Sequence, residues 1–152
     1  SKKEKNLDIF ISKLLDNAKI KYSADGSSIK EINDALKTAS KKGTGRVGFP
    51  EFVGISNDFI IVIEDKADLE KQANYTNDDE TELATDIKSL TDFAENGALH
   101  YGKHIIENTN FKKIFAFGEA ANLLKENMSV DISKNLDEVL SKASQLKGDL
   151  GL

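Results

Sequence analysis

The chain has 152 residues, of which 39% are hydrophobic and 31% charged, so it can bury one core of ordinary size and one domain is the default expectation. It has no cysteine, which excludes a disulfide framework and a thiolate metal site, and its net charge of -5 argues against tight DNA binding by this chain alone. No apolar run approaches the ~20 residues of a transmembrane helix and no signal peptide is recognisable, so we expect a cytoplasmic protein with no membrane contact.

Helical patterns come first along the chain. An apolar stripe at helical spacing predicts a first helix over about residues 8–20, and residues 22–27 are expected to form a loop. Ser28 and Glu31 have the spacing of a capping box, and the stripe that follows predicts a second helix that ends near Gly43.

Two adjacent strands are predicted next, over Val47–Ser56 and Phe59–Glu64, because both segments are rich in Val, Ile and Phe. Asn57 and Asp58 between them are turn residues, so the simplest connection is a two-residue hairpin loop. Counting outward from that loop gives the facing pairs: Ser56 with Phe59, Ile55 with Ile60, Val53 with Val62, and Glu51 with Glu64.

The hairpin register places Glu51 opposite Glu64, where facing Cβ atoms lie about 4.5–5.5 Å apart. Lys66 returns to the same face by the period of two, and Asp65 points to the other face. One interpretation is a salt-bridged sheet end in which Lys66 neutralises both acids. The other is a divalent-cation site at the edge of the core, because Phe59–Ile63 is apolar on both faces and predicts a covered central strand. Carboxylate oxygens suit Mg²⁺, and Mn²⁺ is expected to substitute.

Three motifs carry a resemblance to a known family: GFPEF at 48–52, IVIEDKAD at 61–68 and GALHYGKHI at 97–105. An acid after Pro50, followed after twelve residues by Glu64-x-Lys66, resembles the PD-(D/E)XK nuclease superfamily. Over about residues 27–118 the chain resembles, more narrowly, the N-terminal nuclease region of bacterial restriction-modification proteins fused to an N6-adenine DNA methyltransferase.

The resemblance implies an α/β, restriction-endonuclease-like mixed sheet with flanking helices, and a metal-dependent DNA endonuclease. Glu51 and Glu64 would be metal ligands and Lys66 the catalytic base or charge stabiliser. Glu31 would be a third carboxylate that supports the metal. Its capping-box position also explains it structurally, as a cap of the second helix. Glu51 stands where Asp is usual in the family, which keeps a second function open: a catalytically impaired nuclease-fold module that binds DNA or another protein.

The basic residues of the segment KKGTGR precede the first site strand. Lys41, Lys42 and Arg46 are candidates for contact with the backbone of double-stranded DNA, whereas a solvated helix end explains the two lysines equally well. Methyltransferase and specificity domains of the same chain or complex are the partners that the resemblance implies. Tethering to them would raise the effective concentration of this domain at its substrate.

The second half of the chain is expected to hold an acidic loop over residues 67–82 and one long or two joined helices over about residues 82–107, with a possible break at Asn96 and Gly97. His100 and His104 lie four residues apart but lack the Glu of a zinc-protease motif. Residues 113–118 predict a strand beside the Glu64 strand. We therefore expect a nuclease-like domain over 1–118 and a helical extension over 119–152.

Overall fold

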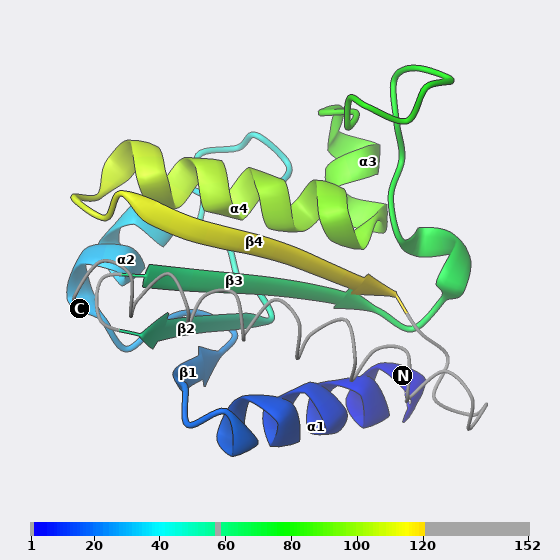
Figure 1. Ribbon diagram of the computed structural model, residues 1–152. Coiled ribbons are helices and arrows are strands. Elements are labelled where there is room, and N and C mark those ends of the chain that lie inside the picture. The colour runs from blue at the N-terminus through cyan, green and yellow to red at the C-terminus, as the bar shows by residue number, and fades with distance from the viewer. Residues whose placement is uncertain (1, 57–58, 121–152) are drawn as a thin grey trace.

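The computed structural model describes residues 2–56 and 59–120, which form one four-stranded mixed sheet with helices on both faces (Figure 1). The strands follow one another in the order β1-β2-β3-β4. Their bounds are β1 Lys21–Ala24, β2 Phe52–Ser56, β3 Phe59–Lys66 and β4 Lys113–Ala120. β1 and β2, and β2 and β3, pair antiparallel, whereas β3 and β4 pair parallel, so β3 is a central strand. This mixed α/β architecture is consistent with the expected restriction-endonuclease-like class.

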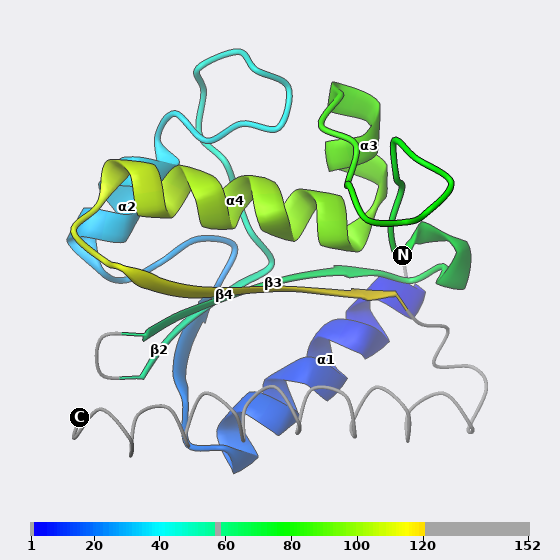
Figure 2. The same cartoon turned by 45° about the horizontal axis from the view of Figure 1, so that its top comes forward.

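The helices divide between the two faces of the sheet. Their bounds are α1 Lys2–Asn17, α2 Lys30–Leu36, α3 Ile87–Asp92 and α4 Ala94–Asn108, and a short 3-10 turn spans Leu69–Lys71. Figure 2 views the sheet nearly edge-on, with α1 on one side and α2, α3 and α4 on the other. The molecule is therefore a three-layer structure in which both faces of β3 are covered.

The alternation of side chains along β3 creates a separate core on each face. Ile61 and Ile63 pack with the apolar stripe of α1, whereas Ile60 and Val62 pack with the stripes of α2 and α4. All five residues of Phe59–Ile63 are at most 2% exposed. Burying side chains of this size contributes about 1.5–3 kcal/mol each, so β3 is a main source of stability.

The register predicted for the hairpin is confirmed. Ser56 lies opposite Phe59 and Val53 opposite Val62, as the two-residue connection requires. The strand predicted beside β3 is also confirmed, and it runs two residues further than expected, through Glu119 and Ala120. The predicted helical extension otherwise falls on residues 121–152, outside the described residues, and remains a prediction.

Several boundaries differ from the sequence-based expectations. Residues 22–24 were expected in a loop but belong to β1, a four-residue edge strand too short to show a clear alternation. The second helix ends at Leu36, after which turns lead to β2, and the capping box is absent because Ile29, rather than Ser28, is the N-cap. The long helical pattern breaks at Phe93, three residues before the expected position. None of the described helices combines the length and apolar character needed to cross a bilayer.

Candidate functional site

The last three residues of β3 direct charged side chains to both faces of the sheet. Glu64 continues the face of Ile60 and Val62, toward α4, and Asp65 continues the face of Ile61 and Ile63, toward α1. Both acids are nearly inaccessible, with Glu64 2% and Asp65 4% exposed. Buried carboxylates are rare unless they are paired or bind a metal, so this end of β3 is the candidate functional site.

On the α1 face, three acids converge. Asp8 of α1, Glu51 just before β2 and Asp65 of β3 each offer a carboxylate oxygen, and these oxygens lie within 4.8 Å of one another. Within residues 2–56 and 59–120, the buried oxygens Asp8 Oδ1 and Asp65 Oδ2 accept no hydrogen bond. Buried carboxylate oxygens without partners, gathered in one place, are what a divalent cation would satisfy. This cluster could hold a metal ion.

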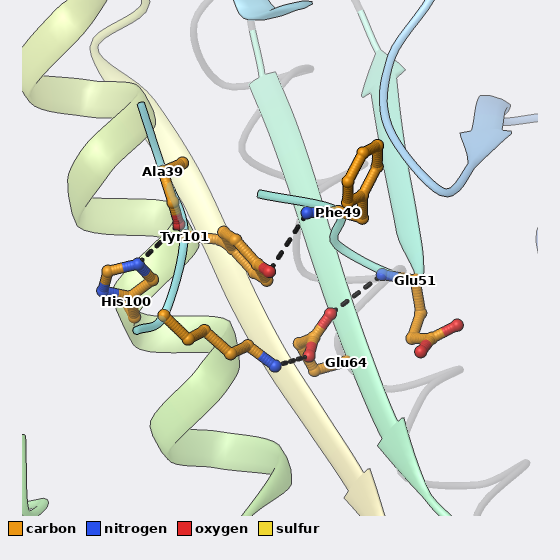
Figure 3. A network of polar contacts seen from close by, with 7 residues as sticks. Ala39, Phe49, Glu51, Glu64, His100 and Tyr101 are labelled. Atoms are coloured by element: carbon orange, nitrogen blue, oxygen red, sulfur yellow. Dashed lines mark hydrogen bonds and ion pairs between the residues drawn. The ribbon is translucent and has the colours of Figure 1, made fainter. Parts of the chain in front are cut away.

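Glu51 joins this cluster because it lies outside the strand: β2 was expected to begin at Val47 but begins at Phe52, the residue after Glu51. β2 starts at Phe52, and the Glu51 N–H donates to Glu64 Oε1 at 2.8 Å instead of extending the ladder. The Glu51 carbonyl accepts from the Asp25 N–H at 3.1 Å. Outside the strand, the side chain does not follow the alternation, and its carboxylate points away from that of Glu64 (Figure 3).

The two carboxylates of the expected Glu51–Glu64 pair therefore do not face each other, and the residues are joined through the Glu51 main-chain N–H. The carboxylates of Glu51 and Asp65, which were expected on opposite faces, lie together.

Electrostatics within the acid cluster favour protonation when no cation is bound. Burial raises the pKa of Glu51 to about 7, and the negative charges of Glu64 and Asp8 add to that shift. Burial also raises the pKa of Asp65, and the adjacent carboxyl of Asp8 raises it further. Each raised pKa means that the native state holds its proton more tightly than the unfolded chain does.

This proton uptake predicts that the metal-free chain becomes less stable as pH rises. Between pH 4.5 and about 7 the unfolded chain has lost the Glu51 proton while the native state retains it, so the free energy of unfolding falls with pH. We expect a loss of about 1–2 kcal/mol from Glu51, below the full linkage value because its side chain is partly exposed. Urea denaturation in EDTA at pH 5 and pH 7.5 measures it. Glu51→Gln should flatten the decline, and stability that rises with pH in this window would contradict the assignment.

On the α4 face, Glu64 is held by a lysine that is not Lys66. Lys41, from the segment between α2 and β2, forms an ion pair with Glu64 Oε2. The Lys41 ammonium also lies 5.1 Å from the centre of the Tyr101 ring, a cation-π distance. The Tyr101 hydroxyl accepts from the Phe49 N–H at 3.1 Å, and burial beside Glu64 raises the pKa of Tyr101 to about 12 (Figure 3). The Tyr101 phenol is therefore neutral at physiological pH.

The remaining predicted site residues lie in different places. Lys66 is partly buried at the end of β3, and strand alternation assigns it to the Glu64 face. Glu31 does not join the acids: its carboxylate accepts from the Asn110 N–H, near the start of β4 and at the opposite end of the sheet from Glu64. Lys42 and Arg46 are exposed, whereas Lys41 was expected to face DNA and is instead directed inward to Glu64.

Sequence reasoning missed Asp8 and the inward role of Lys41. Asp8 had no distinct signal, because an acid next to the buried Leu7 is ordinary on an amphipathic helix. Lys41 had none, because its partner is distant in sequence and is reached through an irregular segment. His100 and His104 do not converge on the acids. His100 Nε2 lies 2.8 Å from the Ala39 carbonyl oxygen, and His104 Nε2 lies 3.0 Å from the Thr38 hydroxyl, so both contact the segment after α2.

Comparison with known proteins gives one significant relative. The type II restriction enzyme and methyltransferase RM.BcgI of Heyndrickxia coagulans is 38% identical to this chain over 117 residues, which are 76% of the chain. The matched part is 18% of that protein, so the chain spans less than a fifth of its relative's length. No family model and no solved structure match. The chain is thus related to a restriction-modification enzyme.

Proposed function

We propose that this chain is the metal-dependent endonuclease domain of a restriction-modification protein and that its substrate is double-stranded DNA. The observation that carries the proposal is the acid cluster Asp8, Glu51 and Asp65, with its buried, unpartnered Asp65 oxygen, at the end of the central strand. The relationship to RM.BcgI supports it, because that protein's name couples a restriction enzyme to a methyltransferase. The Glu64-x-Lys66 motif beside the cluster supports a nuclease of the PD-(D/E)XK type.

Magnesium is the proposed cation, with manganese as a substitute. The donors are all carboxylates, which suit a hard divalent ion, and three converging acids leave positions for water and a substrate phosphate. Glu51 is the ligand common to the observed cluster and to the predicted pair, and Asp8 and Asp65 stand beside it. Glu64 is held next to the cluster by the Glu51 N–H. When bound, the ion would supply an activated water and offset the charge that develops on the phosphate.

The other residues have roles in binding and charge stabilisation. We assign to Lys66 the stabilisation of negative charge at the reacting phosphate, as its place on the Glu64 face allows. Lys42 and Arg46 project from the segment before β2 and would contact the DNA backbone. Because the chain carries a net charge of -5, we propose that methyltransferase and specificity domains of the same chain or complex bring it to DNA.

The test is a calorimetric titration of the chain with Mn²⁺. We expect one binding event, which Asp65→Asn weakens at least about 10-fold, since even the loss of an indirect contact to a metal ligand typically costs 10–100-fold. Asp79→Asn, in the exposed loop after β3, is the matched control and should bind as the parent does. In parallel, the complete protein should cut plasmid DNA with Mg²⁺ and not in EDTA. Absence of Mn²⁺ binding, or equal binding by Asp65→Asn, would refute the metal site.

One observation favours a second candidate function, a nuclease-fold module with impaired chemistry that binds DNA or a protein. The Lys41 ion pair already neutralises Glu64, and such a pair can persist as a structural contact. This candidate predicts DNA binding by the complete protein without Mg²⁺-dependent cleavage, and it would be preferred if Glu64→Ala left every measured property except stability unchanged.

A further inference from the structure

Lys41 is a surface-loop residue whose charge lies inside the molecule. Its side chain is 14% exposed and that of its partner Glu64 3%. An ion pair this deeply buried loses most of its hydration, and removal of one partner leaves the other charge uncompensated. The pair therefore needs a structural or functional reason beyond ordinary surface electrostatics.

The space that Lys41 occupies is shaped for it. A Cβ at Gly97 of α4 would lie 2.8 Å from Lys41 Nζ and 3.1 Å from Cε, so the ammonium passes where α4 lacks a side chain. The Tyr101 ring lines the same space. The second oxygen of Glu64 accepts from the Glu51 N–H, so both oxygens of this carboxylate are satisfied without a metal. The acids on the other face are not satisfied in this way.

The segment that carries Lys41 is closed on itself and attached at its base. The Ser40 N–H donates to the Arg46 carbonyl at 2.9 Å, which closes the loop 40–46, and His100 binds the Ala39 carbonyl just before it. Beyond this base the loop projects past α4 as the cyan segment in Figure 2, with Lys42 and Arg46 exposed. From this loop, the Lys41 side chain reaches the site through its ion pair with Glu64.

We propose that Lys41 is a positioning residue that stands in for a divalent cation at Glu64. Its ammonium holds the Glu64 carboxylate in the metal-free protein. When a cation binds at the adjacent Asp8, Glu51 and Asp65, Glu64 is drawn to it, Lys41 is released, and the loop 40–46 becomes free to present its basic side chains to DNA phosphates. This inference rests on the proposed metal site and adds to it a link between metal binding and the DNA-contacting loop.

The direction of the effect follows from competition. Lys41 and the metal ion compete for one carboxylate, so each must weaken the binding of the other. Removing the Lys41 ammonium should therefore strengthen metal binding. Removing an exposed lysine nearby should have little effect on metal binding, because water and salt screen its charge. Couplings between competing groups commonly amount to roughly 5- to 150-fold in affinity.

The first experiment is Mn²⁺ calorimetry on Lys41→Met, with Lys37→Met, an exposed lysine just after α2, as the control. We expect Lys41→Met to bind Mn²⁺ about 5- to 150-fold more tightly and Lys37→Met to bind nearly as the parent does. In a Glu64→Gln background, Lys41→Met should have no further effect, because the shared carboxylate is gone.

The second experiment needs no variant of Lys41. Because the chain has no cysteine, Thr44→Cys provides a single thiol in the loop 40–46 for a nitroxide label. We expect the label to become more mobile when Mg²⁺ is added and to be mobile without Mg²⁺ when Glu64→Gln is also present. The same label at Asp79→Cys should not respond.

The outcomes separate the two proposals. If the parent chain binds no Mn²⁺, the proposed metal site falls and this inference falls with it. If Mn²⁺ binds and Asp65→Asn weakens it, but the loop label does not respond and Lys41→Met binds no tighter, the metal site stands and Lys41 is only a structural ion-pair partner.

Discussion

Replacing Glu51 by glutamine is expected to abolish divalent-metal binding and DNA cleavage together while leaving the fold intact. Glu51 contributes a carboxylate to the observed cluster and is also the first acid of the predicted motif. The substitution keeps the side-chain volume and the main-chain N–H that binds Glu64. Only the charge is lost. Cleavage by the complete protein should fall roughly 10³-fold or more, since removing one neutral transition-state donor already costs 10²–10³.

The same substitution should make the metal-free chain more stable, which a merely damaging mutation would not do. It removes one of three crowded acids, and with it the proton uptake that follows from the raised pKa of Glu51. Calorimetry with Mn²⁺, plasmid cleavage and urea denaturation in EDTA give the three readouts. Glu107→Gln, an exposed acid on α4, serves as the control and should leave all three unchanged. Glu51→Gln that binds Mn²⁺ with unchanged affinity would remove this residue from the site.

The architecture near the site was largely predictable because it depends on short-range rules. A two-residue turn between two apolar segments fixes the β2–β3 register, and an apolar run on both faces identifies β3 as central. Periodicity likewise located the stripe of α1. These features follow from the positions of a few residues relative to their neighbours in the chain.

The side-chain arrangement at the site was less predictable because it depends on tertiary packing. The register count placed Glu51 on the Glu64 face on the assumption that β2 includes it, but the strand starts at Phe52 and the carboxylate turns to the other face. Asp8 and Lys41 approach from a helix and an irregular loop whose packing on the sheet no periodicity specifies. Glu31 was assigned by analogy with acids on a preceding helix, but its carboxylate binds the Asn110 N–H, and the helical acid that lies near Glu51 and Asp65 is Asp8 on α1.

Lys66→Met is expected to lower DNA cleavage by roughly 10²–10⁴-fold, the usual contribution of a positioned catalytic group, while Mn²⁺ affinity changes little. The lysine is two residues beyond Glu64 on β3 and so on the same face, but the ion pair with Glu64 is made by Lys41. Lys66 is thus not required to hold the carboxylate, and we assign it to the reacting phosphate. Plasmid cleavage by the complete protein and Mn²⁺ calorimetry on the chain measure the two effects separately.

The two lysines then act as controls for each other. Lys41→Met should change Mn²⁺ affinity and loop mobility, whereas Lys66→Met should change the rate of cleavage at saturating Mg²⁺ with little change in affinity. A lysine that served only to balance the negative charge at the end of β3 would shift metal affinity in the same sense at either position. Tighter Mn²⁺ binding in Lys66→Met with unchanged cleavage would therefore reverse the assignment and make Lys66 a charge-balancing residue.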